Sequence, residues 1–419
     1  MTQVIKYPNG LKLAVDPITS VRSVAIGIWV GAGSSRETPE NNGISHFTEH
    51  VMFKGTDRYT AFDIANEFES CGSLVNAFTG KEATCYYVKC VDEYTEKCFE
   101  LLSHIFLHSS FDAAELDKER KVIVEEINMD EDSPEDICYE LIAKAAYGDS
   151  PLGMTILGPI SNVKRFTRYD VLAYMDELYT ADNVVIAVSG NITAKQADEL
   201  VRKYLLDDIR SGKAKKSCVK KSASVNAFSS RVKDFEQSNI ALSYPSITFD
   251  HPLSSAQAIF STVFGGGMSS RLFQKVREQM GLAYSVYSTP LSYVGDGNFV
   301  IMLNVTPSNT EKALSAVKHE IDEIVNKGIT EEEFSKAKIQ LKSSLVFAEE
   351  SIQNVMMRQG KMLLLKDKCY SVDERIRELD AVTLSTVNEF IRNTLVSEKV
   401  SAAYVGKKIH ADILTLIKG

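Results

Sequence analysis

The sequence predicts an α+β protein built from two homologous domains. The chain has 419 residues, more than the ~250–300 that a single hydrophobic core usually supports. It contains both strand-like and helix-like segments, and its second half repeats patterns of the first. We therefore expect an N-terminal domain over residues 1–209, a linker over 210–236 and a C-terminal domain over 237–419. The linker is placed where lysines among Ser and Ala replace the apolar patterns of the flanking segments.

The elements of the first domain follow from local patterns. The runs SVAIGIWV and DNVVIAVS predict strands over 23–30 and 182–189. We expect a helix over 60–70, a strand over 83–91, a helix over 93–109 and another helix from Ala194. The stretch FDAAELDKERKVIVEEINMD predicts a helix over 111–130, with Asp112 as its N-cap and Glu115 in the capping-box position.

The segment His46-Phe47-Thr48-Glu49-His50 carries the most chemical information. Residues three and four apart share one face of a helix, so both imidazoles and the Glu49 carboxylate point the same way. Two histidines at this spacing can bind one Zn²⁺, and a neighbouring carboxylate can take a proton from a metal-bound water. This order of residues is the inverted zincin motif. A second pair, His104 and His108, has no carboxylate between its members, and we expect it to interact with a helix C-terminus.

A third metal ligand is expected on the helix over 111–130. Glu119 and Glu126 are seven residues apart and therefore lie on one face of that helix. Glu125 lies about 100° away from Glu126 around the helix axis, so only one of these two can face the metal. A solvated acidic helix is the simpler interpretation of these glutamates taken alone.

An internal repeat supports a functional role for these residues. Residues 111–127 align with 329–345, and residues 42–52 align with 266–276. None of the five candidate site residues has a histidine or a carboxylate at the aligned position of the second copy. The residues that align with His46, Glu49, His50, Glu119 and Glu126 are Ser270, Phe273, Gln274, Ala337 and Ser344. We therefore expect a metal in the first domain and none in the second.

Together these segments resemble the pitrilysin, insulysin and mitochondrial processing peptidase family of inverted zincins, and most closely its short bacterial branch. The similar segments are Trp29–Thr56, Gly72–Val88 and Gly265–Ser288, and the resemblance extends over roughly residues 5–410. It implies that each domain is a mixed, largely antiparallel sheet packed with helices. It also implies a homodimer that encloses a chamber.

The resemblance implies a role for each matching residue. His46, His50 and Glu126 would bind one Zn²⁺ per chain, Glu49 would be the general base, and Glu119 would orient a ligand histidine. The strand residues Asn76, Ala77 and Phe78 would bind a peptide as an added strand. Arg277 and Tyr284 would steady the substrate carbonyl at the zinc of the partner chain.

Composition narrows the class of protein and of partner. A net charge of −9 argues against nucleic acid and gives no basis for binding to anionic membranes. The seven cysteines are odd in number and form no C-x-x-C pair, which suggests reduced thiols. No apolar stretch approaches the ~18 residues of a membrane span, and the first residues show no signal peptide, so the expected location is the cytoplasm.

These observations predict a zinc-dependent endopeptidase that cleaves oligopeptides or unstructured segments inside a dimeric chamber. Two alternatives remain open from the sequence. One is a non-catalytic assembly subunit that keeps the fold, and the other is a maturation protease for one dedicated precursor.

Overall fold

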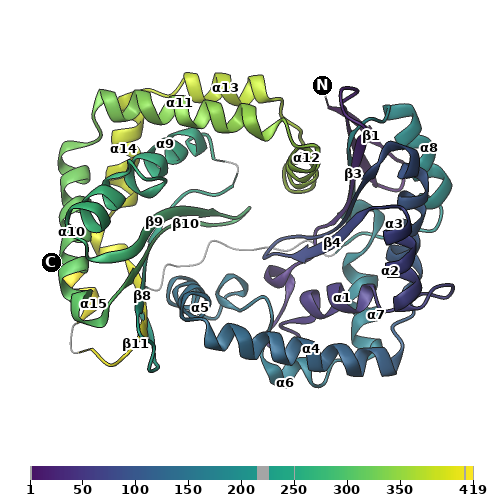
Figure 1. The fold of residues 1–419 in the computed structure, drawn as a ribbon, viewed down its shortest axis with the longest axis horizontal. Helices are drawn as coiled ribbons and strands as arrows, with labels where there is room; N and C mark the ends of the chain where they lie inside the picture. Colours follow the sequence, from purple (N-terminus) through teal and green to yellow (C-terminus); the bar gives the residue numbers. More distant parts are fainter. Residues whose placement is uncertain (1, 215–225, 250, 410–411, 419) are drawn as a thin grey trace. The chain divides into compact units, whose positions relative to one another are not determined.

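The computed structural model describes residues 2–214, 226–249, 251–409 and 412–418. The chain divides into two compact units (Figure 1). The first comprises Met1–Ile127, Thr155–Ser217 and Val346–Val372, and the second comprises Asn128–Met154, Cys218–Leu345 and Asp373–Gly419. Each unit contains one sheet with helices packed on both faces, which confirms the predicted α+β class.

The sheet of the first unit has the strand order β1-β2-β6-β3-β5-β4. β2 and β6 are parallel and all other neighbours are antiparallel, so the sheet is mixed and largely antiparallel. Its strands are β1 (Gln3–Lys6), β2 (Lys12–Pro17), β3 (Ser23–Val30), β4 (Leu74–Thr79), β5 (Thr84–Val91) and β6 (Val184–Gly190). Its helices are α1 (Ile44–Met52), α2 (Ala61–Ser70), α3 (Thr95–His108), α6 (Ile160–Val163), α7 (Arg168–Leu178), α8 (Ala194–Tyr204) and α12 (Ile352–Lys366).

The central strand β3 is buried on both faces because all of its residues after Ser23 are apolar. Alternate side chains such as Ile26 and Ile28 join the large core beneath the helices on one face, while Trp29 joins a smaller core with α12 on the other. The helix approaches the sheet closely at Gly360, where a Cβ atom would lie 2.1 Å from Trp29 Nε1. Glycine is therefore required at this contact.

The second unit repeats this architecture with the strand order β7-β11-β8-β10-β9. β7 and β11 are parallel and the remaining neighbours are antiparallel, as in the first unit. Its strands are β7 (Phe228–Val232), β8 (Ser238–Pro245), β9 (Ala283–Ser292), β10 (Gly297–Val305) and β11 (Ser401–Gly406). Its helical elements are α5 (Pro134–Tyr147), α9 (Ser254–Gly265), a π-helix over Phe273–Gln279, α10 (Thr310–Lys327), α11 (Glu331–Ala348), α13 (Val372–Asp380), α14 (Leu384–Thr394) and α15 (Ile413–Lys418).

One register of the internal repeat holds and the other is wrong. The helix α4 (Ala113–Asp132) and α11 begin at the same offset as residues 111 and 329, as the first alignment predicts. In the other segment, β3 is followed by α1, α2 and β4, whereas β8 is followed by α9, the π-helix and β9. The counterpart of α1 is therefore α9, which precedes the aligned range 266–276. Because α9 contains no His, Asp or Glu, the second unit still lacks the chemistry of α1.

In each unit, one helix comes from the part of the sequence that was assigned to the other predicted domain. α5 lies within the range 1–209 but packs on the second sheet, where Ile137 and Ile142 join Ala241 and Val300. α12 lies within the range 237–419 but packs on the first sheet. Helical periodicity shows that a helix has an apolar face, but it does not show which sheet that face covers. The compact units are consequently not two continuous blocks of sequence.

Several predicted boundaries need adjustment. β3 spans the predicted 23–30, and the other predicted elements occur with ends shifted by a few residues. β7 lies within the range 210–236 assigned to the linker, and residues 215–225 of that range fall outside the described residues. The capping box at the start of α4 is not formed, because Glu115 pairs with Lys118 while Asp112 Oδ1 accepts the Ala114 N–H. Within the described ranges, no helix has both the length and the apolar character to cross a bilayer.

Candidate metal centre

The helix α1 presents two histidines from its polar face. Phe47 and Val51 are buried in the core of the first unit and fix the rotation of the helix about its axis. His46 and His50 then emerge on the other side, one turn apart, with ring centroids 4.5 Å from each other. The buried apolar face therefore determines where both imidazoles lie.

Glu126 of α4 joins the two histidines. Its Oε2 atom lies 3.7 Å from His46 Nε2 and 3.5 Å from His50 Nε2. Two donors that bind one tetrahedral Zn²⁺ are about 3.3–3.4 Å apart, given metal–ligand distances of about 2.0–2.1 Å. These separations are longer than good hydrogen bonds, and they exceed the spacing of tetrahedral co-ligands by only about 0.1–0.4 Å. In the described part of the chain, His46, His50 and Glu126 form the one group of three His, Cys, Asp or Glu side chains whose possible ligand atoms all lie within 4.8 Å of one another. The neighbouring Glu125 is exposed.

Glu119 and Lys54 support the His50 ring from its Nδ1 side. Glu119 Oε2 lies 3.2 Å from His50 Nδ1, and Lys54 Nζ lies 2.7 Å from Glu119 Oε1. A carboxylate on Nδ1 places the proton of the neutral ring there and leaves Nε2 free to bind a metal. Burial opposes the ionisation of Glu119, but the contacts with His50 and Lys54 outweigh it and lower its pKa.

The charge states of the two imidazoles suit a cation in this position. Burial lowers the pKa of His46 to about 3, and the nearby His50 contributes to the same direction, so His46 is neutral and able to act as a ligand. Burial also disfavours protonation of His50, but Glu119 and the carboxylates of Glu126 and Glu49 outweigh it and raise the pKa of this ring. The cluster therefore attracts positive charge, and a divalent cation fits its donor set.

Glu49 lies beside this cluster on the same face of α1. Burial raises the pKa of its carboxyl group, while a hydrogen bond from Thr79 acts in the opposite direction. Thr79 Oγ1 donates that bond to Glu49 Oε2 from the last residue of β4. The other oxygen of the carboxylate is left to accept a proton from a reactant.

The edge strand β4 lies next to Glu49. It is the last strand of its sheet, and its side chains alternate between exposed and half-buried positions. Asn76 is exposed, and its Oδ1 atom accepts the N–H of Ala77 at 2.8 Å. Phe78 packs edge-to-face on Trp29, with centroids 5.5 Å apart, so its ring points to the face opposite Glu49. The contact between β4 and Glu49 is thus made by Thr79, the residue that follows the predicted Asn76, Ala77 and Phe78.

Arg277 and Tyr284 belong to the second unit. Arg277 lies in the π-helix with its guanidinium 4.6 Å from the centre of the Phe273 ring, and Tyr284 on the edge strand β9 is 74% exposed.

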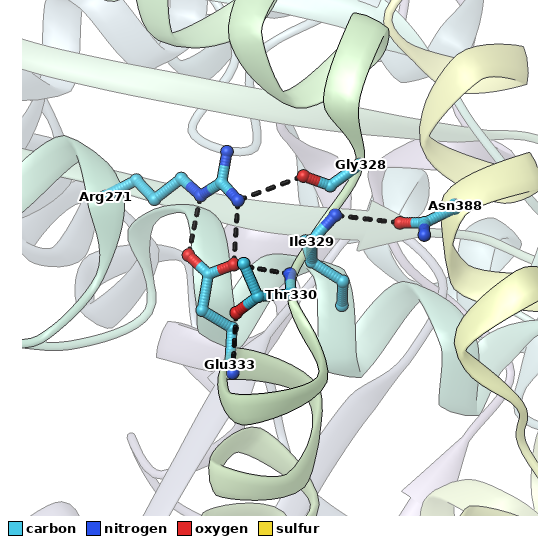
Figure 2. A network of polar contacts seen from close by, with 6 residues as sticks. All are labelled: Arg271, Gly328, Ile329, Thr330, Glu333 and Asn388. Carbon is cyan, nitrogen blue, oxygen red and sulfur yellow. Dashed lines mark hydrogen bonds and ion pairs between the residues drawn. The ribbon is translucent and has the colours of Figure 1, made fainter.

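Figure 2 shows that Arg271, just before the π-helix, binds both carboxylate oxygens of Glu333 and the Gly328 carbonyl. This network fixes the beginning of the π-helical segment on the start of α11.

Three residues near the centre escaped sequence reasoning. Lys54 follows His50 by four residues, so helical spacing could have suggested it. Thr79 is adjacent to the predicted strand residues, but nothing in the pattern places it on Glu49. Glu37 caps α1 from the preceding loop, and only the folded loop brings it there.

The chain matches two family models. Residues 13–160 match "Insulinase (Peptidase family M16)", a range that includes the whole of α1 and α4. Residues 165–341 match "Peptidase M16 inactive domain". The second description agrees with the missing site residues in the second unit.

Several proteins are similar to the chain over nearly its whole length. A Bacillus subtilis protein described as uncharacterized zinc protease YmxG is 40% identical over 93% of this chain and 95% of its own. A Rickettsia felis protein described as a zinc protease is 34% identical over 96% and 97%.

Two solved structures share the fold. A Pseudomonas fluorescens structure described as a peptidase M16 inactive domain has a TM-score of 0.92 at 21% identity, over 98% of this chain and 99% of that one. A Helicobacter pylori structure described as a protease has a TM-score of 0.91 at 20% identity, over 97% and 99%. From these similarities, the chain belongs to the M16 (insulinase) family of peptidases.

Proposed function

We propose that the protein is a zinc-dependent endopeptidase in which Glu49 is the general base. The observation that carries this proposal is the convergence of His46, His50 and Glu126 within 4.8 Å of one another, with the Glu49 carboxylate on the same helix face. Bound there, Zn²⁺ would polarise the scissile carbonyl and lower the pKa of a water molecule.

The side chains around the cluster would perform the proton transfers. Glu49 takes a proton from the attacking water on the carboxylate oxygen that Thr79 does not occupy. Its raised pKa makes it a stronger base than an ordinary surface carboxylate. The same oxygen then returns the proton to the amine of the leaving peptide. Glu119 and Lys54 keep the His50 ring in one tautomer and orientation throughout.

The exposed edge of β4 supports a peptide as substrate. An extended peptide that pairs with this edge would lie alongside Glu49, because Thr79 of the same strand contacts that carboxylate. This geometry favours oligopeptides and unstructured segments, since a folded protein does not offer a free strand. The backbone groups near Ala77 would contact the peptide, whereas the Phe78 ring faces the other side of the sheet.

The homodimer, the cytoplasmic location and the action of Arg277 and Tyr284 at the partner's centre complete the proposal. The homodimer and the roles of Arg277 and Tyr284 rest on the family resemblance, and the location rests on the cysteine pattern and the first residues of the sequence. If Arg277 steadies the substrate carbonyl, Arg277→Ala should cripple turnover without removing zinc, and full activity in this variant would exclude that role.

The decisive experiment compares the zinc-loaded wild type with Glu49→Gln on a library of internally quenched peptides. Zinc content is measured in both proteins, because Glu49 is not a proposed ligand and its loss should leave the metal in place. Cleavage by the wild type alone supports the mechanism. If both proteins hold zinc and neither cleaves any peptide, the endopeptidase proposal fails and a structural subunit, or a protease that needs a presented precursor, becomes the better explanation.

A further inference from the structure

The N-terminus of α1 cannot be capped by its own N-cap residue. Gly43 occupies the N-cap with φ +100°, a conformation that favours glycine. A Cβ atom at this position would lie 2.5 Å from the Leu157 carbonyl oxygen and 3.0 Å from Gly158 Cα. Only glycine fits, and glycine has no side chain to accept a hydrogen bond from the first turn. The cap must therefore come from elsewhere in the chain.

Glu37 provides this cap from the loop before the helix. Its Oε1 accepts hydrogen bonds from Ser45 N at 2.8 Å and Ser45 Oγ at 2.5 Å. Its Oε2 accepts hydrogen bonds from Gly43 N and Asn42 Nδ2, both at 2.8 Å. The residue is 2% exposed. A carboxylate with four donors at the positive end of a helix dipole is a strong cap.

The cap is linked to a second helix. The Ser45 hydroxyl has one proton, which it donates to Glu37, so Tyr174 O–H must donate to Ser45 Oγ across their 2.6 Å contact. Tyr174 lies on α7 and is buried in the core of the first unit. The chain of hydrogen bonds Tyr174–Ser45–Glu37 thus ties the first turn of α1 to a neighbouring helix.

The metal ligand His46 lies in this first turn. It is the third residue of α1 and directly follows Ser45, whereas His50 lies one turn further along. Terminal turns fray more readily than the helix interior, so His46 is the ligand that depends most on the cap. A movement of that turn would change the 3.7 Å separation of His46 Nε2 and Glu126 Oε2, while the His50–Glu126 separation would be kept.

We propose that Glu37 is a positioning residue of the metal centre, which holds His46 in place by capping the first turn of α1. This inference rests on the proposed function, because it concerns the same metal. Glu37 does not contact the ligands itself and acts through the Ser45 backbone and side chain.

The test is zinc affinity of the full chain, measured by competition with a chelator after metal removal. In Glu37→Gln the new NH₂ group replaces one oxygen and faces two donors, so the cap is broken although the side chain keeps its shape. We expect the Kd for zinc to rise about tenfold or more, in line with the loss of a helix cap and of outer-sphere support. The visible spectrum of the Co²⁺-loaded variant should also change, since it reports ligand geometry and not overall stability.

Matched variants separate the possible failures. Glu115→Gln removes a first-turn carboxylate of α4 that contacts Lys118 and should leave the Kd within about twofold of the wild type. If Glu37→Gln also keeps the wild-type Kd and Co²⁺ spectrum, the positioning role is refuted. If His50→Ala binds zinc as tightly as the wild type, the metal centre itself is wrong and the proposed function fails first.

A folding defect would not leave the question open. Circular dichroism establishes whether Glu37→Gln is folded before any titration. Should it be unfolded, Ser45→Ala decides, because it keeps the backbone N–H bond to Glu37 and removes only the hydroxyl between Glu37 and Tyr174. We expect a smaller rise in the zinc Kd, about threefold, and an unchanged Kd would again refute the role.

Discussion

Thr79→Val is the substitution that most directly tests how Glu49 is oriented. The change removes the hydroxyl that donates to Glu49 Oε2 and keeps the shape and β-branching of the side chain. Valine at this position should therefore preserve β4 and its pairing with β5. What is lost is one hydrogen bond to a carboxylate that must hold a fixed direction for proton transfer.

The size of the effect follows from the character of that bond. A hydrogen bond to a charged group contributes about 1.5–3 kcal/mol, and the half-buried position of Thr79 favours the lower end of this range. Because about 1.4 kcal/mol corresponds to a factor of ten in rate, we expect kcat to fall about tenfold. KM should change little, since the hydroxyl contacts the base and not the peptide.

The assay is the steady-state hydrolysis of one quenched peptide by zinc-loaded proteins. Thr262→Val is the matched control, because the half-buried Thr262 hydroxyl donates to the Ala258 carbonyl at 2.9 Å within α9 of the second unit. Equal zinc content in all three proteins excludes an effect on the metal. A kcat for Thr79→Val within twofold of the wild type, or a change confined to KM, would refute the orienting role of Thr79.

Three further predictions concern the metal, the helix α12 and acid stability. Glu119→Gln should weaken zinc binding about 10–100-fold, because His50 loses the carboxylate on Nδ1; chelator competition measures this, and an unchanged Kd would contradict it. Gly360→Ala should destabilise the first unit, since a rigid indole 2.1 Å from the new Cβ costs about 1–3 kcal/mol and outweighs the ~1 kcal/mol gain in helix propensity. Denaturant unfolding should show this, with Gly267→Ala, which has no atom within 4 Å of its Cβ, as the control; equal stabilities would show that α12 shifts freely. For Glu333, burial opposes ionisation, but Arg271 and the Thr330 N–H outweigh it and lower the pKa. Its stabilising effect is then present above the unfolded pKa of about 4.3 and is lost as the pH falls through the folded value. Glu333→Gln should accordingly be less stable than the wild type at pH 7, and the difference should shrink below about pH 4; a difference that is independent of pH would contradict the linkage.

The sequence and the structure agree best where the physics is local. The strand over 23–30 and the helix that carries His46, Glu49 and His50 occur as predicted, because apolar runs and helical spacing depend on neighbours in the chain. The relation of residues 111–127 to 329–345 also survives, since both helices begin at the same offset and bury the aligned pairs Leu116/Phe334 and Glu119/Ala337.

The predictions from sequence fail where the structure depends on contacts between segments that are far apart in the chain. Periodicity could not show that α5 covers the second sheet and α12 the first, because an apolar face does not specify its partner. The alignment of residues 42–52 with 266–276 was wrong because α9 is the structural counterpart of α1. α9 contains none of the His or Glu residues of α1, so no shared residue could reveal the correct alignment. The predicted linker was too long because β7 is short and half-exposed, which weakens its pattern as a strand.

By itself, the sequence determined that one helix presents two imidazoles and a carboxylate on one face, because this follows from the helical repeat alone. Helical spacing left Glu125 and Glu126 open as the candidate third ligand, and the family resemblance favoured Glu126. Only the tertiary structure decided that Glu126 and not Glu125 faces the histidines, that Thr79 holds Glu49 and that Glu37 caps α1. These contacts join residues brought together by packing of the core, and such packing leaves no periodic trace in the sequence.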